Sequence, residues 1–195
     1  MIKITELKNL LQGQCLVIGH GESINKIKWE KIAHIPKILV NFYDPLIANV
    51  MGIVCWDKDI MKEVYQQREL HYDFKRIYPL IFYSGCEIEQ KADVFLDPKT
   101  FVPSTHPVFS GARAIYLSQY LGYNEILLIG FDFIPHTSKN YMVQQKEIDN
   151  PSDINKSLQV QMDCFQHIDW IHNNVFQTNK DSRLTYFKQE QLNGN

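Results

Sequence analysis

The chain has 195 residues with a formal net charge of -2, and 45% of them are hydrophobic while 22% are charged. This length allows one sizeable hydrophobic core and is short for two, so we predict a single domain over residues 1–195. The near-balanced charge gives no global reason to expect a nucleic-acid partner, and no apolar run approaches the ~20 residues that a membrane-spanning helix needs.

The cysteines and the first residues bear on the cellular compartment. Four cysteines are spread along the chain without a C-x-x-C pair, namely Cys15, Cys55, Cys86 and Cys164. Residues 1–11 lack the charged segment followed by an apolar core that is typical of a signal peptide. We therefore expect a cytoplasmic protein with reduced cysteines, of which Cys15 and Cys55 are buried in or beside apolar strands.

Short apolar runs alternate with helix-like segments along the chain. The expected strands are Gln14–Ile18, Ile35–Asn41, Met51–Trp56, Pro79–Tyr83, Ala92–Leu96, Glu125–Gly130 and Arg183–Phe187. The expected helices are Ile2–Leu11, a stretch from Asp57 to about Leu70, one that Ser110 opens, and Asn155–Val175. This alternation indicates an α/β sandwich with a mostly parallel sheet, a class that binds ligands outside the carboxyl ends of its strands.

The first strand runs into a glycine turn, Gly19-His20-Gly21-Glu22-Ser23, after which a helix is expected to start in the polar segment that ends near Lys31. Such a turn lets the backbone approach a ligand, although a tight structural turn explains it equally well. The dinucleotide fingerprint lacks its third glycine and the P-loop pattern is absent, so neither a nicotinamide or flavin site nor a P-loop is predicted. Asn41, at the end of the second strand, can hold a base or sugar, or it can cap the next turn.

The stretch Ser104–Phe133 organises the chain as a loop, a helix and a buried strand. Ser110 is a candidate N-cap for the helix, and Gly122 tolerates the positive φ that ends one. Arg113 lies in the first turn, where the helix dipole disfavours a cation. Either an anion binds there, held by the N–H groups and the arginine, or Arg113 is simply solvated.

Four segments together resemble a known family, in the order in which they occur. They are G-x-G-x-S at 19–23, V-N-F at 40–42, S-G-x-x-A-x-x-L at 110–117 and L-G-Y-x-E-I-x-L-x-G-x-D-F at 121–133. This set resembles the bacterial sialyltransferases of glycosyltransferase family 42. It is also similar to the related domain of flagellin-modifying motility accessory factors and of an archaeal pterin pyrophosphokinase.

The resemblance implies a modified Rossmann fold that binds a nucleotide-activated sugar, most closely a CMP-sugar, and transfers the sugar to a glycan or protein acceptor. The residues placed in the donor site are Gly19, Gly21, Ser23, Asn41, Ser110, Gly111 and Asp132, together with Arg113 from the anion argument. The glycine turn would line the phosphate and base, and Asn41 would hold the cytidine or sugar. The helix start would contact the donor, and Asp132 would lie beside the ribose.

The implied reaction is displacement at an anomeric carbon, in which a base takes the acceptor proton and hydroxyls stabilise the departing phosphate. The family's histidine base would fall in P-S-D-I-N-K-S-L at 151–158, which contains no histidine. His136, earlier in the same loop, is therefore the candidate base, and Tyr141 would contact the leaving phosphate. His20 and His106 also lie near the expected edge. No cofactor is implied, and no spacing of metal ligands is present.

Two alternatives stay open at this point. A pyrophosphokinase-like enzyme on the same fold would need magnesium and hence clustered carboxylates, for which Asp44, Asp57 and Asp132 each follow a strand. A non-catalytic nucleotide- or sugar-binding domain is favoured by the missing histidine. The acceptor and the oligomeric state, a homo-oligomer included, are not specified by the sequence.

Overall fold

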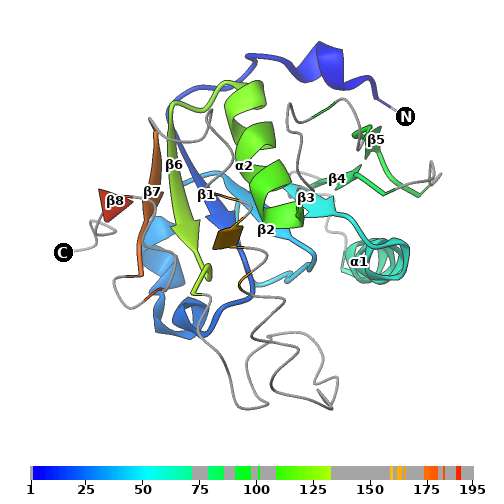
Figure 1. Cartoon of the computed structure of the whole chain (residues 1–195). Coiled ribbons are helices and arrows are strands. Elements are labelled where there is room, and N and C mark those ends of the chain that lie inside the picture. Colours follow the sequence, from blue (N-terminus) through cyan, green and yellow to red (C-terminus); the bar gives the residue numbers. More distant parts are fainter. Residues whose placement is uncertain are drawn as a thin grey trace.

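The protein is an α/β sandwich built on one sheet of parallel strands (Figure 1). The computed structural model describes residues 2–71, 79–85, 91–97, 101, 109–132, 159, 162–163, 165, 174–179, 182 and 188–189. Within these ranges eight strands pair in the order β5-β4-β3-β2-β1-β6-β7-β8, and each of these pairings is parallel. The predicted fold class, a mostly parallel Rossmann-like sheet flanked by helices, is confirmed.

The elements have the following bounds. The strands are β1 Gln14–Ile18, β2 Lys37–Val40, β3 Val50–Cys55, β4 Leu80–Tyr83, β5 Val94–Phe95, β6 Glu125–Ile129, β7 Val175–Gln177 and β8 Lys188–Gln189. The α-helices are α1 Lys58–Leu70 and α2 Ser110–Leu121. The short 3-10 helices are η1 Ile4–Leu7, η2 Glu22–Lys26 and η3 Trp29–Ile32.

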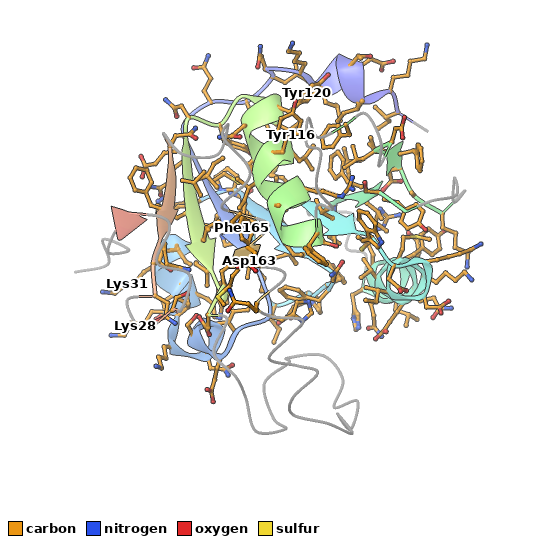
Figure 2. All side chains as sticks on the ribbon, in the orientation of Figure 1. Lys28, Lys31, Tyr116, Tyr120, Asp163 and Phe165 are labelled. Atoms are coloured by element: carbon orange, nitrogen blue, oxygen red, sulfur yellow. The ribbon has the colours of Figure 1, made fainter. Side chains whose placement is uncertain are left out.

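The sheet separates two hydrophobic cores, because its central strands are continuous apolar runs with both faces covered. The core beneath α2 includes Val17, Ile38, Leu128, Ala114, Leu117 and Phe165. The core on the opposite face includes Leu16, Leu39, Ile53, Met61 of α1 and Ile24 of η2. Figure 1 shows α2 in green lying across the sheet, and Figure 2 labels Phe165 near it. Cys15 and Cys55 are buried and free, as predicted, whereas the other two cysteines lie outside the described residues.

The order of the strands reverses beside β1. The chain lays down β2 to β5 on one side of β1 and then returns to place β6 on the other side. A parallel sheet with such a reversal leaves its ligand crevice at the carboxyl ends of the two strands that flank it. Because α2 connects two parallel strands, its first turn lies at that same end. We call residues 18–23, 41–42, 55–57, 83–84 and 129–132 the carboxyl edge.

Three predicted elements differ from the structure. The Ile2–Leu11 helix is wrong: only η1 forms, because the chain turns at Asn9, which has a positive φ of 55°. The glycine turn leads into the short 3-10 helices η2 and η3 rather than an α-helix. Val175 begins β7 and does not end the predicted long helix. The Arg183–Phe187 strand and most of that helix lie outside the described residues.

A buried ion pair ties the end of α1 to the sheet. Arg68 is 1% exposed and donates to the Asp93 carboxylate and to the Pro79 carbonyl, the latter at 3.0 Å. The same carboxylate accepts the N–H of Ile81 at 2.7 Å. This carboxylate therefore links α1 to β4 just before β5 begins.

Among the described residues, no helix is both long and apolar enough to cross a membrane.

Candidate functional site at the carboxyl edge

Two turns meet backbone to backbone where β1 and β6 end. The N–H of Gly19 donates to the Ile129 carbonyl at 2.8 Å, and the N–H of Gly21 donates to the Gly130 carbonyl at 2.7 Å. A Cβ on Gly19 would lie 2.7 Å from the Gly130 oxygen, and one on Gly21 would lie 2.5 Å from Asp132 Oδ2. The glycines are therefore required by the contact between the turns. Their predicted role in lining a phosphate stays a prediction.

Asp132 holds these turns together. Its Oδ2 accepts the N–H of Ser23 at 2.7 Å, and its Oδ1 accepts the Ser23 hydroxyl at 2.5 Å and the Asn179 amide at 2.7 Å. The residue is 2% exposed, so both carboxylate oxygens are engaged inside the protein. In this arrangement Asp132 and Ser23 shape the edge. The predicted contact of Asp132 with a ribose stays a prediction.

The last residue of β7 and the segment after it support the same turn, which the sequence did not predict. Gln177 Nε2 donates to the Phe131 carbonyl at 3.0 Å, and the Ser182 hydroxyl donates to that oxygen at 2.6 Å. Both residues are buried. The only signal in the sequence was a run of polar residues after the short apolar segment V-F, which does not reveal what they contact.

Helix α2 begins at the carboxyl edge without a side-chain cap. Its N-cap residue is Phe109, which makes no side-chain cap hydrogen bond, and the first turn has no acidic residue. Ser110 is the first helical residue, so the prediction that it caps the helix is wrong: Phe109 takes the extended cap conformation instead. Among the described residues, no group accepts the N–H of Ser110, Gly111 or Ala112. These N–H groups and the helix dipole favour an anion at this end.

Arg113 brings a positive charge to the ends of β3 and β4. It is 2% exposed, so the interpretation as a solvated arginine is wrong. Its Nη1 donates to the Ser84 hydroxyl at 2.6 Å, and its guanidinium carbon lies 4.1 Å from the ring centroid of Trp56. Ser84 in turn donates to the Leu96 carbonyl at 2.9 Å. Arg113 is thus held inside the protein by Ser84 and Trp56, two residues that are distant from it in the sequence.

The ring of Phe131 lies between the glycine turn and the start of α2. A Cβ on Gly19 would be 3.3 Å from Phe131 Cδ2, and one on Gly111 would be 2.7 Å from Phe131 Cε1. Phe131 itself is buried. The helix start and the glycine turn are thus neighbours at the carboxyl edge, in contact with one aromatic ring.

Asn41 has an unusual conformation at the end of β2. Its φ is 64°, and its N–H donates to the Val54 carbonyl at 2.9 Å. Its Oδ1 is buried without a hydrogen-bond partner, so this oxygen does not cap the following turn. Leaving a buried acceptor unsatisfied costs about 1–3 kcal/mol, so such an atom in a folded protein calls for an explanation, such as a bound water or ion or a functional role.

His20 lies between the ends of β1 and β2. Its Nε2 is 2.6 Å from the Val40 carbonyl, and because a carbonyl only accepts, Nε2 carries the proton. Burial lowers the pKa of this histidine, against the effect of the hydrogen bond to Val40. His20 is therefore neutral near pH 7. The other histidines considered from the sequence, His106 and His136, lie outside the described residues, as does Tyr141.

The carboxylates considered for magnesium have local partners. Asp44 accepts the N–H of Leu46 at 2.8 Å. Asp57 caps α1 by accepting the N–H groups of Asp59 and Ile60. Within the described ranges no three His, Cys, Asp or Glu side chains gather as they would around a metal ion. The carboxylates named for the pyrophosphokinase alternative thus do not cluster.

The fold and the reversal of strand order define a Rossmann-like α/β protein, a class that binds its ligands at the carboxyl edge. No protein-family model matches the chain, and no curated protein matches it in sequence. A solved structure that does match is the sialyltransferase CstII from Campylobacter jejuni, studied in complex with a substrate analogue, CMP-3FNeuAc. The match has a TM-score of 0.53 and 14% identity over 94% of this chain and 88% of that chain. It shows that the two proteins share a fold.

Proposed function

We propose that this protein is a glycosyltransferase that binds a nucleotide-activated sugar, with a CMP-sugar as the donor, at its carboxyl edge. One observation carries the proposal: α2 begins there uncapped, beside the reversal of strand order, with its first N–H groups available to an anion. Two further facts support it. The solved structure that matches in fold was studied with a CMP-linked substrate analogue, and four segments of this sequence resemble those of the family 42 sialyltransferases in the same order.

The donor phosphate would accept hydrogen bonds from the N–H groups of Ser110, Gly111 and Ala112. Arg113 is too buried to wrap the phosphate, but its charge at the same edge favours an anion. The Asn41 amide would contact the cytidine or the sugar, which would give its unsatisfied oxygen a partner. Ser23 and the two glycines would shape the floor of this site through their bonds to β6 and Asp132.

The reaction would break the bond between the anomeric carbon and the phosphate oxygen and form a bond from that carbon to the acceptor oxygen. The acceptor hydroxyl loses its proton to a base, and the phosphate leaves with the bonding electrons. Helix N–H groups aimed at the departing oxygen stabilise its developing charge. For the base we propose His136, and for a hydroxyl on the leaving phosphate we propose Tyr141; both lie outside the described residues.

The proposal is tested first by calorimetry and thermal unfolding with CMP, CDP, UMP, AMP and GMP. A ligand at about 100 times its dissociation constant adds about 2.7 kcal/mol to the free energy of unfolding. We expect stabilisation by the cytidine nucleotides and little by the purine nucleotides. Absence of any response to CMP and CDP would contradict the proposed donor.

The anion site is tested by removing a single N–H group from α2. Proline is tolerated at the first helical position, and the extended Phe109 before it is compatible with proline. Ser110→Pro should weaken CMP binding about tenfold, the equivalent of one hydrogen bond, relative to Ser110→Ala. The matched control is Lys58→Pro at the first position of α1, which should leave CMP affinity unchanged.

Equal CMP affinities for Ser110→Pro and Ser110→Ala would remove the helix start from the proposed site. Donor hydrolysis in the absence of acceptor would then separate a transferase from a protein that only binds the donor. A binding protein would give a CMP response without release of free sugar from the CMP-sugar.

A further inference from the structure

His20 contacts the residues on both sides of Asn41. Its Nε2 donates to the carbonyl of Val40 at 2.6 Å. Its ring meets the ring of Phe42 edge-on, with centroids 4.8 Å apart and planes at 70°. The glycine turn after β1 therefore reaches across to the end of β2 through this one side chain, and Asn41 lies between its two points of contact.

Asn41 needs such support because of its backbone. A φ of 64° lies in the left-handed region, which is unfavourable for a residue with a side chain. Asparagine tolerates the region better than most residues, but a strained conformation persists only where its surroundings hold it. Here β3 holds the N–H of Asn41 through Val54, and His20 holds the carbonyl that precedes it.

The result of this conformation is an amide placed at the carboxyl edge with its oxygen unsatisfied. If the peptide group between Val40 and Asn41 rotated, the φ of Asn41 would relax, and the side-chain amide of Asn41 would leave this position. The bond from His20 opposes that rotation directly, because it is made to the oxygen of the same peptide group.

We propose that His20 is a positioning residue for nucleotide binding: it fixes the Val40–Asn41 peptide so that the Asn41 amide faces the donor. This inference rests on the proposed function, since it assigns His20 to the same site. It also gives His20 a task other than that of the base, because its Nε2 proton is committed to Val40 and its side chain is packed against Phe42.

The test compares two substitutions that differ in one hydrogen-bond donor. His20→Gln can keep an N–H at the place of Nε2, whereas His20→Leu fills similar space without a donor. We expect His20→Leu to weaken CMP binding about tenfold, as for one lost hydrogen bond. His20→Gln should restore most of that affinity, which a role in packing alone would not predict.

The second arm is a double-mutant cycle with Asn41→Ala, measured by calorimetry with CMP. If His20 acts through Asn41, His20→Leu should have no further effect on affinity once the amide is absent. Additive losses, or equal affinities of His20→Gln and His20→Leu, would overturn the proposal.

A third measurement needs no ligand and so separates this inference from the proposed function. Should wild-type protein fail to bind CMP, the proposed function fails, and the φ of Asn41 then decides on His20 alone. It is measured by NMR scalar couplings in the wild type and both variants. A positive φ kept in His20→Gln and lost in His20→Leu supports the positioning role, and an unchanged φ in both overturns it.

Discussion

The α-helices α1 and α2 both begin at the carboxyl edge, and their N-termini are built in opposite ways. Helix α1 follows β3 and is capped by Asp57, which accepts the N–H groups of Asp59 and Ile60 at 2.8 and 3.2 Å. Helix α2 follows β5 and has Phe109 at its cap position, with no side-chain cap and no acid in its first turn. One helix satisfies its own first turn, and the other leaves that turn available.

The difference is informative because a side-chain cap is easily obtained and contributes about 1 kcal/mol. The first turn of α2 instead carries Arg113, a cation where the dipole opposes one. The stability of α2 comes from packing, since eight residues of this helix are buried. An N-terminus kept uncapped and electropositive at the ligand edge of a Rossmann-like fold is what an anion site requires.

The largest effect should come from breaking the attachment of α1. Asp93→Ala removes the carboxylate that Nη1 of Arg68, 1% exposed, contacts and that accepts the Ile81 N–H. Arg68 then keeps only the more exposed Glu69 carboxylate at 3.4 Å among its described carboxylate partners, and we expect a loss of about 3 kcal/mol in the free energy of unfolding. Urea unfolding measures it. CMP affinity of the folded protein should stay unchanged. A parallel loss of affinity would contradict the assignment of CMP binding to the start of α2 rather than to α1.

A smaller effect should follow from giving α2 the kind of cap that α1 has. Phe109→Asp places a carboxylate where the donor phosphate would lie, and we expect CMP affinity to fall by more than about tenfold through charge repulsion and competition for the N–H groups. Phe109→Ala is the control for the lost ring. If both variants bind CMP equally, α2 does not hold the phosphate.

Removing the cap of α1 should be milder. Asp57→Ala deletes the acceptor for two N–H groups, and a loss of about 1 kcal/mol of stability is expected. Thermal or urea unfolding measures this loss, and calorimetry should show CMP affinity within error of the wild type. A marked loss of affinity would instead place Asp57 in the ligand site.

The smallest effect concerns a second unsatisfied polar atom. The Tyr123 hydroxyl is buried without a hydrogen-bond partner, as is Asn41 Oδ1, but Tyr123 lies just after Gly122, the C-cap of α2, away from the carboxyl edge. Tyr123→Phe should leave stability within about 0.5 kcal/mol or raise it, with CMP affinity unchanged. A change in CMP affinity would show that the site extends beyond this edge.

The sequence predicted elements whose cause is local. The apolar runs of β1 to β6 were recognised because both faces of those strands are covered. Gly122 was recognised as the end of α2 because its φ of 109° suits glycine. Asp57 was correctly placed at the start of α1, where its side chain accepts the N–H groups of the first turn.

What the sequence could not predict depends on contacts between distant segments. The burial of Arg113 follows from Trp56 and Ser84, which are brought to it by β3 and β4. The engagement of Asp132 with Ser23 joins residues that are 109 positions apart. Strand β7 is three residues long, too short to stand out from the helix-like pattern before it.

The ring of Phe131, in contact with Gly19 on one side and Gly111 on the other, sets a limit on how this protein can diverge. A methyl group at Gly111 would need a smaller side chain at position 131, so these two positions should change as a pair, whereas a methyl group at Gly19 would meet the Gly130 carbonyl whatever residue stands at position 131. A paired replacement such as Gly111→Ala with Phe131→Leu should therefore be better tolerated than Gly111→Ala alone. Homologues with an alanine at position 111 should carry a compensating smaller residue at position 131.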